Sequence, residues 1–542
     1  MPATRITLAL NVKQSQRAPL LVPASASSDP LLPNSIRTLV FKTAQSKLRI
    51  KKPTRIFVAG TGDELLSEAE WKSNFRNDII LLVSAGEDYV GVKRGSGRHA
   101  EANPDCPVYL LASKAPVDQL SITQLGTTAH TLPGIVHAVG QPDLHPGTKF
   151  PIGAVFVSRG WIHPPLIGGD IGCGMAWYRT RLSREQLESD KGRKVAEKLR
   201  GLEGAWRTQA ERKVWLEDGE GSCKAGWEWD QALGTIGAGN HFAEIQVVEE
   251  VEGGEEGGLA CDAVVLLVHS GSRGFGGSIL RKYTSEGQTS LQEGSTQAKE
   301  YLEEHDRACR WAKANRDLIA LRFLSCLEPG EPVWSLGQNG TEVEDAYNAV
   351  SCAKAKLAER RVVDIWHNNV ERVKWPPTPP ESSSLETNGS TTIPTPSQGH
   401  HYIHRKGAAP THDPSTTFPL SILPLPGSRG TPTLILSPLF TPCTSWGFKN
   451  ALSLAHGAGR SMSRAKALSS LSQKYKAQSL LEPKGRDGTW VVCENRDLVF
   501  EEAPEAYKDV EAVGEDLVRE GVARRVGWCR ARVSYKVRDE GR

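Results

Sequence analysis

The feature that most constrains the fold is the mixture of two hydrophobic periodicities between residues 106 and 542. Short apolar runs that end in polar turns, such as residues 263–272 (AVVLLVHSGS), are typical of strands. Segments with apolar residues at helical spacing, such as residues 184–202 and 298–324, lie between such runs. The mixture predicts a large α+β domain over residues 106–542. Within it, residues 375–399 are rich in proline, serine and threonine and predict a disordered insertion.

The N-terminal part of the chain has a different composition. Residues 18–34 are rich in proline, serine and alanine, so we expect residues 1–34 to form a disordered N-terminal segment. Three runs rich in valine, isoleucine and phenylalanine follow, with a polar helical segment between the last two. This order predicts a small β-grasp module at residues 35–95, which resembles ubiquitin-like or doublecortin-like modules. The alternative is an N-terminal extension of the main domain.

The composition of the chain restricts which classes of protein and which cellular compartments are possible. The formal net charge of +3 is too small to indicate nucleic-acid binding by itself, so any RNA surface must be a local basic cluster. Ten cysteines without a CxxC pair argue against a zinc ribbon or a disulfide framework and favour a reducing intracellular compartment, cytoplasmic or nuclear. Three basic residues and no acidic one among residues 1–19 keep a mitochondrial location as the alternative. No run of 18 apolar residues exists, so we expect no membrane span.

Five residues in glycine-rich or polar turns have the side chains of metal ligands. Asp170 and Cys173 lie three apart in the turn DIGC, and a carboxylate with a thiolate suits a divalent ion of intermediate softness. His241, His269 and His367 each lie at the border between an apolar element and a polar turn. Five ligands are too many for one structural zinc and suit two adjacent ions that share the thiolate. The alternative is that these are ordinary buried side chains.

The segment AHGAGRSMSR places His456 in a glycine-rich turn after an apolar run. One interpretation is a histidine that caps a buried element, and the other is a histidine that contacts an anion. Next to a site for two metal ions, such a histidine could act as a nucleophile that takes up a nucleotidyl group. Arg273 in HSGSRG adds a guanidinium that could hold a phosphate.

Together these motifs resemble the RtcB family of RNA-splicing ligases. DIGCGM, GNHFAE, HSGSRG, WHNN, HRKGA, PGSRGT and HGAGRSMSR occur in the order that marks this family, from about residue 130 to the C-terminus. The resemblance implies an RtcB-like catalytic domain with a site for two metal ions in a central cleft. The segment from PDLHPGTKF to DIGCGM is similar to the divergent branch that is coupled in bacteria to a release-factor homologue. The loop PGSRGTPT departs from the family pattern at Arg429 and Pro432, so we expect different nucleotide contacts there.

The resemblance to this family implies a GTP- and Mn²⁺-dependent RNA ligase. Such an enzyme joins RNA ends that carry a 2′,3′-cyclic phosphate or a 3′-phosphate to 5′-hydroxyl ends through a guanylylated histidine, in tRNA splicing or RNA repair. An archease-type activator is a candidate partner, and residues 35–95, which lie outside the family pattern, would contact another protein. The alternatives are a dimetal phosphodiesterase or end-healing hydrolase, and a non-catalytic RNA-binding scaffold.

Carried over to matching positions, the resemblance assigns roles to individual residues. His456 would be the guanylylated nucleophile, with Asp143 orienting its imidazole. Two Mn²⁺ ions, with Cys173 as the bridging ligand, would be held by Asp170, Cys173, His241, His269 and His367. The positions expected to contact GTP are Asn240, Glu244, Asn368, Ser428, Gly457, Gly459, Tyr507 and Lys536. The positions expected to hold RNA phosphates are Arg273 and Arg460.

Overall fold

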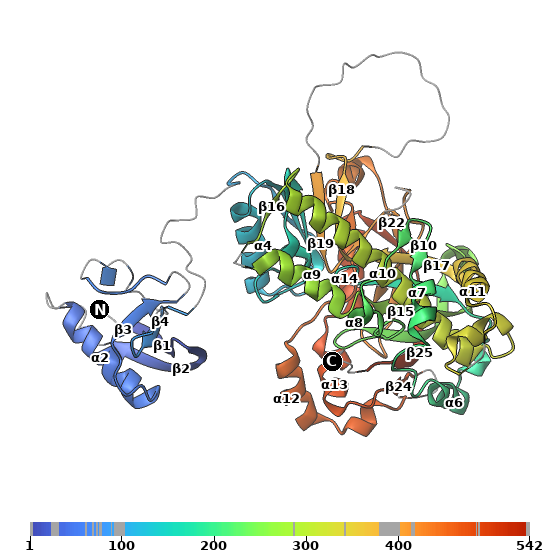
Figure 1. Cartoon of the computed structure of the whole chain (residues 1–542), viewed down its shortest axis with the longest axis horizontal. Coiled ribbons are helices and arrows are strands. Elements are labelled where there is room, and N and C mark those ends of the chain that lie inside the picture. The colour runs from blue at the N-terminus through green and yellow to red at the C-terminus, as the bar shows by residue number, and fades with distance from the viewer. Residues whose placement is uncertain are drawn as a thin grey trace, which may run out of the picture. The chain divides into compact units, whose positions relative to one another are not determined.

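The chain divides into two compact units, residues 1–101 and residues 102–542, and each is described by itself. The computed structural model (Figure 1) describes residues 4–22, 32–59, 62–67, 70–71, 74, 79–87, 89–90, 103–285, 288–340, 343–378, 401–413, 418–483, 485 and 488–537. Among these residues, no helix combines the length and the apolar character needed to cross a lipid bilayer.

The N-terminal unit is a four-stranded sheet with helix α2 packed against it. Its elements are β1 (Thr4–Leu10), β2 (Lys13–Val22), α2 (Leu32–Lys47), β3 (Arg55–Val58) and β4 (Ile80–Ser84). The strand order is β2-β1-β4-β3. β1 and β2 form an antiparallel hairpin, β1 pairs with β4 in parallel, and β3 pairs with β4 antiparallel. The last strand in the sequence therefore lies in the middle of the sheet, beside the first.

The prediction that residues 1–34 are a disordered segment is wrong for residues 4–22, which form β1 and β2. Ile6 and Leu8 are two residues apart, so their side chains lie on the same face of β1, and both are fully buried. The hairpin therefore belongs to the core of the N-terminal unit, and the unit extends well before residue 35.

The run SIRTLVFK at residues 35–42, predicted as a strand, is part of helix α2. Ile36, Val40 and Ala44 are spaced four apart and are fully buried, so they form one face of a helix. The helical period of these apolar residues outweighs the β propensity of valine, isoleucine and phenylalanine.

The second unit mixes helices with two large sheets, which confirms the predicted α+β fold class. The eight-stranded sheet has the order β17-β9-β15-β12-β25-β22-β21, with β24 paired to β25. Its strands are β9 (Gly174–Arg179), β12 (Phe242–Val251), β15 (Val264–Ser270), β17 (Arg361–Trp366), β21 (Leu423–Pro426), β22 (Thr433–Pro438), β24 (Trp490–Val492) and β25 (Ala523–Tyr535). The five-stranded sheet has the order β18-β19-β7-β6-β5. Its strands are β5 (Val108–Leu110), β6 (Ile135–His145), β7 (Ile152–Arg159), β18 (Asn368–Val373) and β19 (His401–Lys406).

Helices and short strand pairs surround these sheets. The α-helices are α4 (Gln119–Thr131), α5 (Pro164–Ile167), α6 (Asp190–Lys198), α7 (Gln209–Trp215), α8 (Trp227–Asp230), α9 (Gly274–Thr284), α10 (Thr296–Leu327), α11 (Ala346–Arg360), α12 (Arg464–Lys474), α13 (Arg496–Glu501) and α14 (Val510–Arg519). The short pairs are β8 (Trp161–Ile162) with β16 (Leu291–Gln292), β10 (Glu217–Asp218) with β11 (Gly221–Ser222), β13 (Glu255–Glu256) with β14 (Leu259–Ala260), and β20 (Ala408–Pro410) with β23 (Ser453–Ala455).

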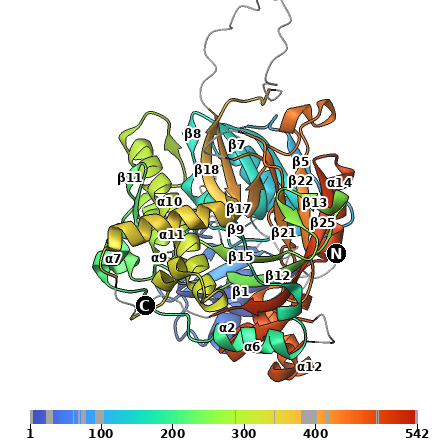
Figure 2. The same ribbon diagram turned by 90° about the vertical axis from the view of Figure 1, so that its right-hand side faces the viewer.

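Strand β15 is buried on both faces. Val264, Leu266 and Val268 belong to the core that includes helix α10, whereas Val265 and Leu267 belong to the core on the opposite face. Figure 2 shows α10 and α11 beside β17, β9 and β15; α10 contacts β9 and β15, and α11 contacts β9. Because successive strand residues point to opposite faces, a strand segment between two cores must be apolar at every position, as residues 264–268 are.

The predicted insertion at residues 375–399 lies outside the described residues from residue 379 onward. The residues that precede it are described, and the Trp375 ring stacks on Phe448 with the ring centroids 5.0 Å apart. The chain that leads into this segment is therefore anchored in the core, and the prediction of disorder stays a prediction.

Candidate active site

Four of the predicted metal ligands lie at neighbouring strand ends in the eight-stranded sheet. Cys173 precedes β9, and His241 precedes β12. His269 is near the end of β15, and His367 directly follows β17. β15 pairs antiparallel with both β9 and β12, and β17 pairs antiparallel with β9. These four residues meet, although they are far apart in the sequence, because their strands are neighbours whose ends lie at one edge.

The sulfur of Cys173 is the centre of this group. Its Sγ lies 3.2 Å from Nε2 of His241 and 3.3 Å from Nε2 of His269. Nε2 of His367 lies 3.2 Å from the same sulfur, and Asp170 Oδ2 lies 2.8 Å from His241 Nε2. The side chains form two groups that could each hold a metal ion, one with Asp170, Cys173 and His241 and one with Cys173, His269 and His367. All five predicted ligands are therefore brought together, and Cys173 belongs to both groups.

The electrostatics of these side chains suit a cation. Burial lowers the pKa of His269 and His367 well below the usual range, so both imidazoles are neutral, which is the form that binds metals. Burial raises the pKa of Cys173 well above its usual range, and the charge of Asp170 adds to this effect. Burial also raises the pKa of Asp170, but His241 and Cys173 outweigh it, so the net pKa is lowered. A divalent cation between these groups would favour the thiolate.

Backbone contacts orient His241 toward the group. Its Nδ1 lies 3.1 Å from the carbonyl oxygen of Ile236, which can only accept a hydrogen bond, so Nδ1 carries the proton. The lone pair is then on Nε2, which faces Cys173 and Asp170. Facing lone pairs and a carboxylate repel one another without a cation between them, so the donor set fits a divalent transition metal.

His456 follows strand β23 and makes a carboxylate–imidazole pair. Its Nδ1 lies 2.8 Å from Oδ2 of Asp143, a fully buried carboxylate near the end of β6. The carboxylate fixes the proton on Nδ1, so Nε2 has a lone pair. The His456 ring centroid lies 4.5 Å from that of His367. The predicted nucleophile therefore lies directly beside the predicted metal ligands.

Tight packing in this region requires glycine. At Gly459, an added Cβ would lie 2.3 Å from the backbone oxygen of Asp143, and φ is +70°. At Gly407, an added Cβ would lie 2.9 Å from Cε1 of His456, and φ is +67°. Both positions combine a close approach with a backbone conformation that favours glycine.

Arg405 ties the nucleophile strand to the five-stranded sheet. Its guanidinium is fully buried, donates from Nη1 to Glu371 of β18, and donates from Nε to Ser453 Oγ at 2.8 Å. Ser453 begins β23, which ends directly before His456. Burial raises the pKa of Glu371, but the Arg405 and His412 contacts outweigh it and lower the pKa to about 2, so the carboxylate stays charged.

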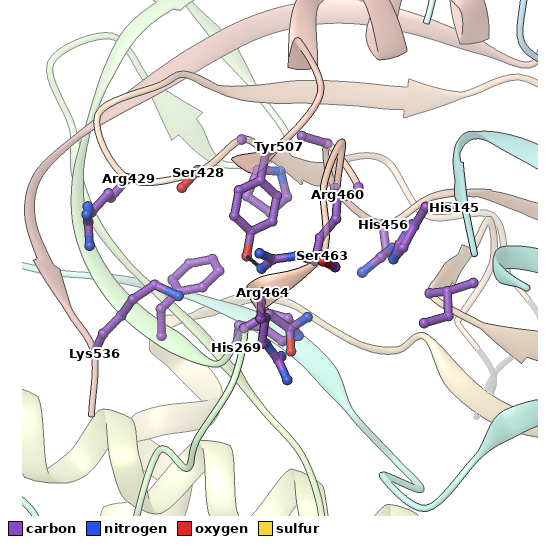
Figure 3. Close-up of a pocket in the computed structure, with 18 of the residues that line it drawn as sticks. His145, His269, Ser428, Arg429, His456, Arg460, Ser463, Arg464, Tyr507 and Lys536 are labelled. Carbon is purple, nitrogen blue, oxygen red and sulfur yellow. Dashed lines mark hydrogen bonds between the residues drawn. The ribbon is translucent and has the colours of Figure 1, made fainter. Parts of the chain in front are cut away.

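A cavity of about 480 Å³, the central cavity, opens in front of His456 (Figure 3). The predicted site residues that line it are His456, His269, Asn240, Glu244, Ser428, Gly457, Gly459, Arg460, Tyr507 and Lys536. A cavity of this volume is large enough for a nucleotide. Because His269 also belongs to one of the candidate metal groups, that group and the predicted nucleotide contacts face the same space.

Two predicted contact residues do not line the central cavity. Asn368 donates from Nδ2 to the Asp170 backbone oxygen at 3.2 Å and accepts from the Gly407 amide at 2.8 Å, so it supports the metal-ligand loop. Arg273 donates from Nε to Thr235 Oγ1 at 3.2 Å and begins helix α9. Its φ of +58° is unusual for a residue other than glycine.

Glu502 is a central residue that the sequence did not predict. Its fully buried carboxylate lies 3.0 Å from Arg460 Nη1, 3.3 Å from Arg464 Nε and 3.6 Å from Lys536 Nζ, and it accepts a hydrogen bond from the Tyr507 hydroxyl. Burial raises the pKa of Glu502, but the charges of Lys536 and Arg460 outweigh it, so the net pKa is lowered. One carboxylate thus organises four side chains around the cavity.

Arg460 and Arg464 differ in how they are held. The Arg460 guanidinium donates to the Met462 and Glu501 carbonyls as well as to Glu502, and it lies over the Tyr507 ring at 5.0 Å from its centroid. Arg464 lines the same cavity with its side chain 50% exposed. The predicted phosphate contact Arg460 is thus bonded to protein, and Arg464 is the more accessible cation.

Lys536 lies on the far side of the cavity from His456 (Figure 3), and Glu244 also lines the cavity. Burial raises the pKa of Glu244. Burial lowers the pKa of Lys536, whose Nζ lies 5.5 Å from the centroid of the Phe242 ring. Arg429, at which the loop departs from the family pattern, lines the same cavity and donates to the Val499 carbonyl.

Comparison with known proteins identifies the family. A family model described as tRNA-splicing ligase RtcB matches residues 124–216 and 203–537. The RNA-splicing ligase RtcB2 of Escherichia coli is 35% identical over 410 residues, which is 75% of this chain and 89% of that protein. RtcB1 of the same strain is 26% identical over 76% of this chain and 92% of its own length. The tRNA-splicing ligase RtcB of Methanococcus maripaludis is 27% identical over 73% of this chain and 87% of its own length.

The chain therefore belongs to the RtcB family of RNA ligases, as its motifs predicted. The family match covers most of the second unit and begins after the N-terminal unit. The identity to RtcB2, 35%, is higher than the 26% identity to RtcB1 of the same strain.

Proposed function

We propose that this ligase is GTP- and Mn²⁺-dependent and joins 2′,3′-cyclic phosphate or 3′-phosphate RNA ends to 5′-hydroxyl ends through guanylylated His456. The observation that carries the proposal is the pair formed by His456 Nδ1 and Asp143 Oδ2 at 2.8 Å, beside the candidate metal groups and a nucleotide-sized cavity. tRNA splicing and RNA repair are the two settings in which such ends are joined.

The proposed chemistry assigns a task to each atom of this pair. His456 Nε2 attacks the α-phosphorus of GTP, a nitrogen–phosphorus bond forms, and the bond to pyrophosphate breaks. Asp143 accepts the Nδ1 hydrogen bond and stabilises the positive charge that the ring gains. Water opens a 2′,3′-cyclic phosphate end by breaking its bond to the 2′-oxygen, which leaves as the 2′-hydroxyl. An oxygen of the RNA 3′-phosphate then displaces His456 and takes the guanylyl group. Finally, the 5′-hydroxyl attacks the RNA phosphorus and GMP leaves.

Two Mn²⁺ ions would be held by Asp170, Cys173 and His241 and by Cys173, His269 and His367. When bound, such ions polarise phosphoryl oxygens and stabilise the charge that develops on them. The mixture of thiolate, imidazole and carboxylate donors supports a divalent transition metal over Mg²⁺, which prefers oxygen ligands.

The central cavity supports GTP as the nucleotide. Tyr507 offers an aromatic face, Lys536 offers a donor for the guanine carbonyl, and Glu244 offers a carboxylate that can accept from guanine N–H groups. Asn240 and Ser428 add polar contacts, and Gly457 and Gly459 let the nucleotide approach the backbone. Arg273 remains our proposal for the RNA terminal phosphate, and Arg464 joins it because Arg460 is bonded to protein.

A guanylylation assay tests this function. Purified protein with labelled GTP and Mn²⁺ should form an acid-labile, base-stable adduct, and His456→Ala should abolish it. An adduct that persists in His456→Ala would contradict the proposed nucleophile. A dimetal phosphodiesterase or end-healing hydrolase would open cyclic phosphates without forming the adduct, and a non-catalytic scaffold would do neither.

We further propose that the N-terminal unit is a β-grasp module that contacts a protein partner. The support is its hairpin, helix α2, and the parallel pairing of β1 with β4 in the middle of the sheet. All ten cysteines are free, which supports a reducing intracellular compartment. A release-factor-coupled role is also a proposal. So is activation by an archease-type protein, which can be tested by adding such an activator to the joining assay.

A further inference from the structure

A second cavity adjoins the central cavity and has no part in the proposed function. This flanking cavity has a volume of about 500 Å³. It shares His145, Pro146, Arg460 and Ser463 with the central cavity, so the two cavities have a common wall. Its volume lies in the range of small-molecule sites. A polymer whose end reaches His456 could therefore have its next group in the flanking cavity.

The lining of the flanking cavity suits a nucleoside. Val117, Leu144 and Met462 supply apolar surface on which a base can pack. Lys508 supplies a positive charge, and its Nζ donates to the carbonyl oxygens of Pro142 at 3.1 Å and Leu144 at 2.7 Å. Burial lowers the pKa of Lys508 to about 8, so the amine is mostly charged at neutral pH. Apolar walls beside a fixed cation match a base with its adjoining phosphate.

One wall of the flanking cavity is held rigidly. The carboxylate of Asp516 on α14 accepts hydrogen bonds from the backbone amides of Ser113, Lys114 and Ala115, each at 2.9 Å. These residues lead directly into Val117. The wall is therefore preformed, which reduces the entropy that a ligand must lose on binding.

His145 places a hydrogen-bond acceptor between the two cavities. Its Nδ1 lies 2.8 Å from the backbone oxygen of Asp143, which can only accept, so Nδ1 carries the proton and Nε2 has the lone pair. Burial lowers the pKa of His145 to about 4, so the ring is neutral at pH 7. His145 borders both cavities, and Figure 3 shows it beside His456. This acceptor suits a hydroxyl donor that lies close to the reacting phosphate.

We propose that the flanking cavity binds the terminal nucleoside of the 3′-phosphate RNA strand and that His145 Nε2 accepts a hydrogen bond from its 2′-hydroxyl. The proposal rests on the proposed ligase function, because that function brings an RNA 3′-phosphate to His456. The 2′-hydroxyl is attached to the carbon next to the one that carries the phosphate. When the phosphate is at His456, covalent geometry thus keeps the 2′-hydroxyl near His145. The contact would make this subsite select RNA over DNA.

The test compares two 3′-phosphate substrates that differ only in the 2′-hydroxyl of the terminal nucleotide. Wild-type protein should join the ribose end about 10-fold faster than the 2′-deoxy end, the effect of one buried hydrogen bond. In His145→Ala, this ratio should fall to about 2-fold or less, and His145→Gln, whose amide oxygen can accept, should restore part of it. A wild-type ratio near one, or a ratio in His145→Ala equal to that of wild type, would overturn the proposal. A 2′-deoxy change on the 5′-hydroxyl strand serves as the substrate control and should not depend on residue 145.

A second variant tests the cavity without changing His145. Val117→Trp places a large side chain in the flanking cavity, so the base of the terminal nucleoside can no longer pack there. The KM for the 3′-phosphate strand should rise about 10-fold, the effect of losing part of the burial of one apolar group. The matched control is Val518→Trp, at an exposed position on α14 with a side chain that is 44% accessible. Equal KM values for the two variants would contradict the location of the subsite.

Guanylylation of the protein by GTP without RNA separates the two levels of the proposal. If wild-type protein forms no adduct, the proposed function fails. If the adduct forms and the ribose-to-deoxyribose ratio is the same in wild type and His145→Ala, only the subsite assignment fails. If His145→Ala slows formation of the protein–GMP adduct, the ribose-to-deoxyribose ratio can be measured with RNA whose 3′-end has been guanylylated chemically. Joining of this RNA does not require the adduct.

Discussion

The candidate metal ligands and the Glu502 network face the same active site, but they are assembled from different kinds of residues. The ligands are cysteine, histidine and aspartate in glycine-rich turns, held by the ends of four adjacent strands. The Glu502 network consists of glutamate, arginine, lysine and tyrosine from separate segments near the C-terminus. The first group is visible in the sequence because its residue types are rarely combined in turns. In the second group, Arg460, Tyr507 and Lys536 were expected from the family resemblance, but Glu502, which joins them, is distinguished only by its burial.

The electrostatic roles of the two regions also differ. In the metal-ligand group, burial holds His269 and His367 neutral and leaves the positive charge to a cation. In the Glu502 network, the protein itself supplies charges of both signs, because one buried carboxylate contacts three cationic side chains. A region of the first kind should depend on added metal. A region of the second kind should depend on its own side chains.

The largest expected effect comes from Cys173→Ala, which removes the ligand that both metal groups share. We expect loss of both ions and a fall in joining of at least about 10⁴-fold, since each ion contributes several kcal/mol to phosphoryl transfer. Bound Mn²⁺ measured by elemental analysis, together with the joining rate, checks this result. Cys529→Ala, which removes another buried free thiol, is the matched control and should keep its metal. Full metal content in Cys173→Ala would contradict the claim that this region depends on bound metal.

Asp143→Asn should have the next largest effect. The amide can hold the imidazole in the wrong tautomer, so we expect guanylylation to fall by about 10³-fold. Metal content should stay unchanged, because Asp143 belongs to neither ligand group. A stopped-time assay of the protein–GMP adduct measures the effect. A rate equal to that of wild type would show that His456 does not need this carboxylate.

Glu502→Gln should have a smaller effect and should leave the metal in place. Loss of the charge weakens the contacts with Arg460, Arg464 and Lys536, so we expect the KM for GTP in guanylylation to rise about 10- to 100-fold. Glu501→Gln is the control, because the Glu501 carbonyl that accepts from Arg460 remains. If Glu502→Gln lost Mn²⁺ as Cys173→Ala does, the two regions would not be separate.

The smallest expected effect is a change of stability with pH at Lys508. The pKa of Lys508 is lowered by burial from its usual 10.5 to about 8, so between these values the unfolded chain binds more protons than the folded chain. The free energy of unfolding should therefore rise with pH over this window, by no more than about 3 kcal/mol from this group. Denaturant unfolding from pH 7 to 10.5 should show that Lys508→Met loses this rise relative to wild type. Lys114→Met, which replaces an exposed lysine, should keep the rise in unfolding free energy with pH.

The sequence predicted the α+β class and the residues that meet at Cys173, because rare side chains in turns after apolar runs mark strand ends. The pairing of His456 with Asp143 was also expected, from the family resemblance. Glu502 could not be found this way, since EE followed by AP is an ordinary surface pattern and no motif marks its burial. Arg460 was assigned to phosphate because its sequence does not reveal that two backbone carbonyls and Glu502 hold it.

In the N-terminal unit, sequence patterns led to wrong predictions of secondary structure. Its first strands were missed because β1 and β2 lie before a stretch rich in proline and serine, which dominated the prediction of disorder. Helix α2 was missed because a short run with isoleucine, valine and phenylalanine fits a strand as well as a helix. The buried positions Ile36, Val40 and Ala44 resolve this ambiguity, and they are known only once the partner strands are in place.

Arg405 has a consequence for the precision of the site. It fastens β23, the strand before the candidate nucleophile His456, to β18, and β18 begins directly after the candidate metal ligand His367. His456 and His367 therefore follow or precede strands that one buried side chain links, so the spacing of their rings depends on Arg405 as well as on their own rotamers. Alignment of the candidate nucleophile with the candidate metal ligands should then depend little on the sequence of the surrounding loops.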